Sequence, residues 1–185
     1  MNSQFDEDIK IYGKDTPSDG PDFDSIAEKI DFNKANGNEE KAEKLGEIFA
    51  QLKPTDEGLC LLDPESGVSA SVLYHARVLI TFLCGRAIKT EVRDSFLVDT
   101  ARNSMYDYLK KNEPGYYKNL TDGAAYSFYR LALKKSGDAS LLIGQEFAKL
   151  CSAAKDERII ALGQRIYTNT TAYAKAVIEK CEFKY

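Results

Sequence analysis

Histidine is almost absent from this chain, because His75 is the only one among 185 residues. A ferritin-like di-iron centre needs two Glu-x-x-His motifs, and a zincin needs two histidines at i and i+4, so neither site can be built here. A zinc site assembled from His75 and scattered cysteines has no support from their spacing. We therefore expect no metal and no other cofactor.

Catalytic and phosphate-binding motifs are missing as well. The sequence has no G-x-G-x-x-G and no G-x-x-x-x-G-K-[ST], so no nucleotide-phosphate loop is visible. Residues 67–71, GVSAS, begin like the nucleophile elbow of a serine hydrolase, but they lack its closing glycine and a preceding buried strand. These absences favour a protein that is not an enzyme.

The chain also lacks close cysteine pairs and a secretory signal. Its cysteines are far apart, at Cys60, Cys84, Cys151 and Cys181. Free cysteine commonly behaves as a small buried hydrophobe, so we expect reduced thiols in a core. The N-terminal residues MNSQFDEDIK have no basic segment followed by an apolar one, which predicts a cytoplasmic protein.

An excess of basic residues is lacking too. The formal net charge is −4, and residues 1–24 hold seven acidic and two basic residues, which leaves +1 for residues 25–185. A body without a basic stripe predicts no nucleic-acid partner. An acidic mimic of nucleic acid is equally disfavoured, because the negative charge lies outside the body. Glycine and proline among the acidic residues of 1–22 predict a flexible acidic arm. The remaining residues, 23–185, are predicted to form a helical domain.

Apolar residues recur at helical spacing in that domain, and alternation typical of a strand is confined to Ile9 and Ile11. The pattern predicts an all-α fold, a single-domain antiparallel bundle of six or seven helices; a short array of helical repeats is the alternative. A capping box at Ser25–Glu28 and a cap at Asn38 predict the first two helices. The second has the apolar stripe Ala42, Leu45, Ile48, Phe49 and Leu52. Residues 53–67 predict a loop held to the core by Leu59–Leu62.

Residues 67–88 predict a long, mostly buried helix. His75, Arg77 and Arg86 argue against a membrane span, because charges inside a bilayer are costly. Later helices are predicted to start at Thr90, at Thr121 or Asp122, after Gly137-Asp138, and near residue 156. The helix that starts at Thr121 or Asp122 has the expected inner face Ala124, Ala125, Phe128, Leu131 and Ala132. In the last helix, Thr170 is expected to be buried.

Two hypotheses for the function follow, from different regions. Residues 115–130 are rich in aromatics, with Tyr116 and Tyr117 in a predicted loop and Tyr126 and Arg130 at i and i+4 on the next helix. Tyrosine beside arginine is typical of protein interaction sites, so the leading hypothesis is a non-enzymatic, cytoplasmic module that binds a protein partner.

The alternative is a small-molecule-binding protein or a small enzyme with a pocket between helices. Ser71, His75, Arg86 and Lys89 share one flank of the helix at 67–88 and could face an anion. Asp99 or Asp107 of the following helix could pair with His75 in general acid–base chemistry.

Overall fold

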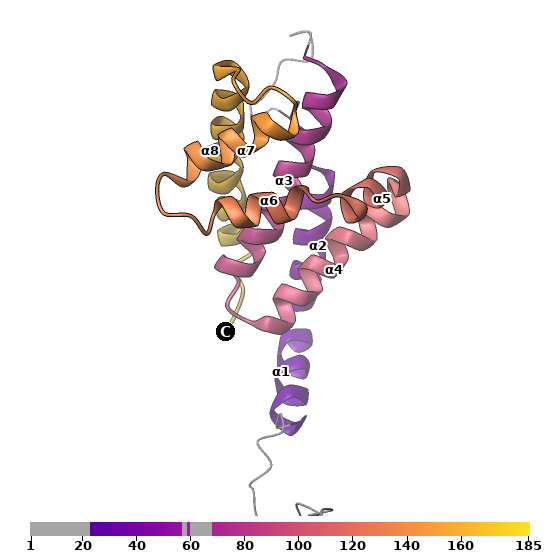
Figure 1. Ribbon diagram of the computed structural model, residues 1–185. Coiled ribbons are helices and arrows are strands. Elements are labelled where there is room, and N and C mark those ends of the chain that lie inside the picture. Colours follow the sequence, from indigo (N-terminus) through magenta and orange to yellow (C-terminus); the bar gives the residue numbers. More distant parts are fainter. Residues whose placement is uncertain (1–22, 57–58, 60–67) are drawn as a thin grey trace, which may run out of the picture.

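The computed structural model describes residues 23–56, 59 and 68–185. These residues form helices and no strand, so the predicted all-α fold is confirmed (Figure 1). The predicted arm over 1–22 lies outside the described residues. The eight helices, one or two more than predicted, are α1 (Phe23–Ala35), α2 (Asn38–Gln51), α3 (Ala70–Glu91), α4 (Ser95–Asn112), α5 (Pro114–Asp122), α6 (Ala125–Ala132), α7 (Ala139–Leu150) and α8 (Glu157–Lys180).

Helix α3 is the central element, and it packs against α8, α4, α6, α7 and α2 (Figure 1). Its Leu79, Ile80 and Ile88 are fully buried, and Cys84 is buried among them as a free thiol. By length and composition α3 is the one described helix that could cross a membrane, but 56% of its most apolar 18-residue window is buried inside the fold. It is therefore a core helix, as predicted.

Two helix pairs approach unusually closely at glycines. A Cβ atom on Gly46 of α2 would lie 2.2 Å from the carbonyl oxygen of Ala101 in α4. In the other pair, a Cβ atom on Gly163 of α8 would lie 2.9 Å from the Cα atom of Gly144 in α7. Glycine at these positions lets the two backbones meet without an intervening side chain.

The predicted caps at Asn38 and Thr90 were wrong. Asn38 does not cap α2, because Gly37, at φ 77°, occupies that position. The buried Asn38 amide instead donates to the side-chain oxygen of Asn33 at 2.9 Å and to the carbonyl of Lys184 at 2.6 Å. Thr90 lies inside α3, and Asp94 caps α4 by accepting from two amides of its first turn. An aspartate carboxylate is a stronger acceptor than a threonine hydroxyl, which explains the later start.

Helix starts elsewhere gave mixed results. Asp138 and Asp156 cap α7 and α8, as the restart after Gly137 and the start near 156 predicted. Ser25 lies within α1 rather than at its cap, because the helix already begins at Phe23 with Asp24 in its first turn. Neither Thr121 nor Asp122 caps α6, whose first turn has no side-chain cap.

The residues Tyr116 and Tyr117, predicted to lie in a loop, belong to helix α5. Proline at the first position of a helix costs no hydrogen bond, so Pro114 starts α5 directly after α4 ends at Asn112. The predicted inner face of α6 was wrong at Phe128 and Leu131, which are 43% and 57% exposed, and right at Ala132, which is buried. Tyr129, which was not predicted to face inward, is fully buried beside the ring of Phe82.

Other predicted burial was partly confirmed. Leu59 is buried, and Asn169 of α8 donates to its carbonyl at 3.1 Å. Residues 60–62, which include Cys60, lie outside the described residues. Thr170 is fully buried, whereas Ile48 of the α2 stripe is 42% exposed. Burial raises the pKa of the Cys151 thiol to about 11, so this cysteine stays protonated at neutral pH.

Candidate anion-binding pocket

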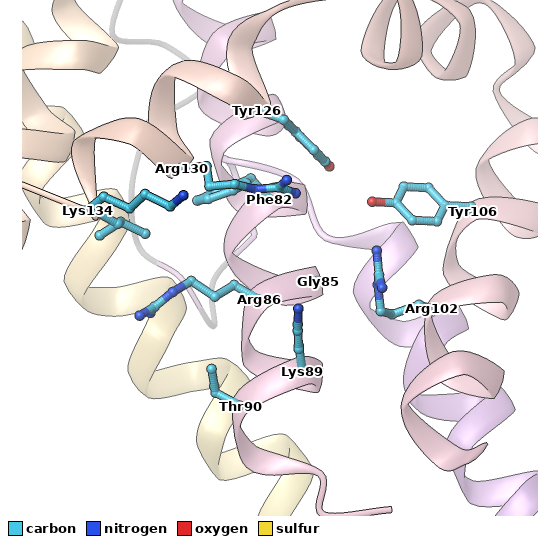
Figure 2. Close-up of a pocket in the computed structure, with 11 residues that line it drawn as sticks. Phe82, Gly85, Arg86, Lys89, Thr90, Arg102, Tyr106, Tyr126, Arg130 and Lys134 are labelled. Carbon is cyan, nitrogen blue, oxygen red and sulfur yellow. The ribbon is translucent and has the colours of Figure 1, made fainter. Parts of the chain in front are cut away.

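A pocket with a volume of about 440 Å³ opens between α3, α4 and α6 (Figure 2). This volume lies in the range of known small-molecule sites. Eleven residues line the pocket: Phe82, Gly85, Arg86, Lys89, Thr90, Arg102, Tyr106, Tyr126, Arg130, Leu133 and Lys134.

Helical spacing explains why each helix contributes a pair or a stripe of side chains. Arg102 and Tyr106 are at i and i+4 of α4, and Tyr126 and Arg130 are at i and i+4 of α6, so each pair lies on one face. Gly85 of α3 lines the bottom of the pocket and places no side chain in it. A Cβ atom there would have only ordinary contacts, 3.5 Å from the Met105 methyl and 3.9 Å from the Tyr106 hydroxyl.

The pocket is basic on all three of its helical walls. Its cations are Arg86 and Lys89 from α3, Arg102 from α4, Arg130 from α6, and Lys134 from the turn that follows α6, and no carboxylate lines it. Across residues 23–56, 59 and 68–185, none of these five side chains forms an ion pair. Neighbouring like charges that remain unpaired create a positive potential, which attracts anions.

The side chains fall into two groups in the view of Figure 2. The hydroxyls of Tyr106 and Tyr126 point toward one another on the right, with the guanidinium of Arg102 below them. Arg86 extends to the left, on the side from which Lys134 approaches. Lys89 and Arg130 point into the space between the two groups.

The Tyr126 hydroxyl is a buried donor that lacks an acceptor. Its oxygen is buried, and no described residue makes a hydrogen bond with it. Burial raises the pKa of Tyr126 well above its ordinary value, and the nearby Tyr106 adds a smaller effect in the same direction. The two hydroxyls lie near one another but do not meet the geometry of a hydrogen bond. The phenol is thus protonated at neutral pH. Phe82 packs against its ring at 5.3 Å, edge to face, which holds the orientation.

The pocket brings together three of the six residues predicted to bind: Arg86, Tyr126 and Arg130. They came from two different hypotheses. Sequence reasoning missed Arg102, Tyr106 and Lys134 as site residues. The i, i+4 spacing of Arg102 with Tyr106 in α4 is the signal that could have drawn attention to these two. Lys134 lies in the turn after α6, where helical spacing gives no such signal.

His75 does not line this pocket. It lies three helical turns from Arg86, about 16 Å along the axis of α3. Its ring packs edge to face on Tyr74 at 5.2 Å, and burial lowers its pKa, so the imidazole is neutral at pH 7. Within the described residues no carboxylate is hydrogen-bonded to it, and Asp107 lies in a separate groove beside α2. The proposed acid–base pair with Asp107 therefore has no support from the described contacts.

Tyr116 is committed to contacts inside the fold. Its hydroxyl lies 2.9 Å from that of Thr81, and the Arg77 guanidinium stacks 4.2 Å from its ring centre. The same guanidinium forms a two-pronged ion pair with Glu113, whose pKa falls chiefly because of that hydrogen bond. These contacts attach α5 to α3. Tyr117 lies apart from them, in a shallow groove beside Tyr106.

Comparison with family models, with curated proteins and with solved structures finds no match. In the part of the chain that the structure describes, no group of three or more histidine, cysteine or acidic side chains could hold a metal ion.

Proposed function

We propose that this chain is a non-enzymatic binding protein that holds an anionic ligand in the pocket between α3, α4 and α6. One observation carries the proposal: five cations without ionic partners among the described residues line one pocket, together with a buried tyrosine hydroxyl that lacks an acceptor. Of the two hypotheses from the sequence, this supports the small-molecule pocket and moves it from His75 to the C-terminal half of α3.

The pocket offers the contacts that an oxyanion needs. The guanidinium groups of Arg102 and Arg130 can each donate two parallel hydrogen bonds to one oxyanion, which a lysine cannot do. The Tyr126 hydroxyl adds a neutral donor that keeps its proton at neutral pH.

Binding rather than catalysis is favoured by what else lines the pocket. The lining residues include no histidine, cysteine or carboxylate, and Thr90 is the only aliphatic hydroxyl. A nucleophile with an adjacent base is the usual minimum for covalent catalysis, and this set does not supply one.

Removal of one pocket cation tests the proposal. We expect Arg130→Gln to weaken the binding of inorganic pyrophosphate by about 10-fold or more, because a hydrogen bond to a charged group contributes about 1.5–3 kcal/mol. The matched control is Arg158→Gln, since Arg158 is 91% exposed on α8 and outside the pocket. Isothermal titration calorimetry of both variants and the native protein measures the effect. Absence of saturable binding to the native protein, or equal weakening in both variants, would contradict the proposal.

A pair of tyrosine variants separates a pocket donor from a structural one. The hydroxyls of Tyr126 and Tyr129 are both buried and without a hydrogen-bond partner among the described residues, but only Tyr126 lines the pocket. Each change to phenylalanine removes an unpaired polar group, so we expect each to raise the free energy of unfolding by about 1 kcal/mol. Only Tyr126→Phe is expected to weaken pyrophosphate binding, by about 10-fold. Thermal unfolding and the same titration check both effects, and equal affinities of the two variants would show that Tyr126 does not contact the ligand.

The cytoplasmic location and the protein partner remain predictions. Phe128 and Leu131 of α6 are large apolar side chains at the surface, 43% and 57% exposed. They are a more suitable contact for a protein than Tyr116, which is occupied inside the fold.

A further inference from the structure

We infer that the ligand of this pocket carries two phosphate groups. The inference rests on the proposed function and narrows it to a class of ligand. It follows from the number of donors, from the charge, and from the arrangement of the lining side chains.

The pocket offers far more donors than acceptors. Its side-chain acceptors are limited to the hydroxyls of Thr90, Tyr106 and Tyr126. The single hydroxyl hydrogen of Thr90 has two acceptors within reach, the carbonyl of Ala87 at 3.4 Å and a carboxylate oxygen of Glu91 at 3.2 Å. A carboxylate has two acceptor oxygens, with about four lone-pair sites between them, whereas a phosphate group has three strong acceptor oxygens. Three guanidinium groups, two ammonium groups and two phenols exceed what one carboxylate can accept. A ligand with several phosphate oxygens matches this donor set.

The net charge of the pocket also favours a ligand with more than one phosphate group. The lining side chains carry five positive charges and no negative charge. A phosphate monoester carries about −1.5 to −2 at pH 7, so one group leaves about +3 to +3.5 of the pocket charge unbalanced, whereas two groups leave about +1 to +2. Two phosphates therefore relieve the repulsion among these cations better than one.

The arrangement provides room for two groups. Tyr106, Tyr126 and Arg102 surround one side of the pocket, while Arg86 and Lys134 reach the other side (Figure 2). Lys89 and Arg130, between them, can contact either group. A volume of about 440 Å³ is much larger than a single phosphate group and accommodates a small scaffold that joins two.

The shared chemistry, two phosphates on a small scaffold, can come from a soluble metabolite or from a lipid headgroup. Four probes distinguish the sources: inorganic phosphate, inorganic pyrophosphate, fructose 1,6-bisphosphate, and phosphatidylcholine vesicles with or without phosphatidylinositol 4,5-bisphosphate. Soluble probes are titrated by calorimetry, and vesicles are tested by co-sedimentation. Stronger binding of a soluble bisphosphate supports a metabolite, and co-sedimentation that requires the phosphoinositide supports a lipid.

The deciding variant removes the cations of one side only. We expect the native full-length chain to bind pyrophosphate or fructose 1,6-bisphosphate about 10-fold or more tightly than inorganic phosphate. Arg86→Gln combined with Lys134→Gln is expected to weaken the binding of pyrophosphate and fructose 1,6-bisphosphate more than that of inorganic phosphate, and so to abolish this preference, because the side with Tyr126 and Arg102 is intact. Circular dichroism confirms that the variant folds.

Each outcome separates the inference from the proposed function. The inference is overturned, while the anion pocket stands, if two results occur together. Inorganic phosphate binds as tightly as pyrophosphate and fructose 1,6-bisphosphate, and the protein does not bind the phosphoinositide vesicles. If the double variant keeps the full preference, the assignment of two sides is overturned. If none of the probes binds the native protein, the proposed function fails together with the inference.

Discussion

Replacement of Gly46 by alanine is expected to lower the free energy of unfolding by about 2–4 kcal/mol, since overpacking against a rigid backbone is among the costliest single changes. The added methyl group would lie 2.2 Å from the carbonyl oxygen of Ala101 and 2.8 Å from the amide nitrogen of Met105. Both atoms belong to the backbone of α4, so α2 and α4 must move apart. The gain in helix propensity from glycine to alanine, about 1 kcal/mol, offsets only part of this cost.

Gly115→Ala is the matched control. Gly115 is also helical, but nothing lies within 4 Å of the position of its added methyl group. We expect this variant to be neutral or slightly more stable, because only the propensity term acts. Urea unfolding followed by circular dichroism measures both changes. A Gly46→Ala protein as stable as the native one would contradict the close contact between α2 and α4.

The longest helices were predictable because their burial pattern repeats over many turns. In α4, for example, Leu97, Ala101, Met105 and Leu109 recur every four residues and are all fully buried. A stripe of this length has only one reasonable inner face. The aspartate caps of α7 and α8 were predictable for a local reason, since a side chain just before the helix satisfies its first amides.

Short helices were predicted less well. In the eight residues of α6, Phe128 with Leu131 and Tyr129 with Ala132 both fit helical spacing, so the sequence does not choose between two faces that are about 100° apart. The choice depends on tertiary packing. Phe82 of α3 presents its ring to Tyr126 and Tyr129, at 5.3 and 5.5 Å, and the face with these tyrosines becomes the inner one.

The pocket could be predicted only in pieces. Arg86 was identified from the polar flank of α3, and Tyr126 with Arg130 from the composition of α6. Their convergence depends on how α3, α4 and α6 pack, which helical periodicity does not specify. The assignment of His75 to the same site failed for a geometric reason, because residues on one flank of a 22-residue helix can lie several turns apart.

Filling the pocket without changing its charge is expected to have the largest effect on binding. Gly85 lies on the floor, and a side chain there projects toward Met105 and Tyr106 with ordinary contacts at its Cβ atom. The Cβ atom of a leucine at this position has no clash, and the rest of its side chain would occupy space that the ligand needs. Alanine is the matched control, because its methyl group removes little volume and stabilises the helix by about 1 kcal/mol.

The most direct test of the anion pocket is calorimetric titration of Gly85→Leu and Gly85→Ala with inorganic pyrophosphate. All five cations remain in both variants, so attraction to a merely basic surface would be the same in each. We predict that Gly85→Leu loses at least about 100-fold in affinity, or 2.7 kcal/mol, while Gly85→Ala stays within about twofold of the native protein. Undiminished binding by a folded Gly85→Leu variant would contradict the central claim that the anion binds inside the pocket between α3, α4 and α6.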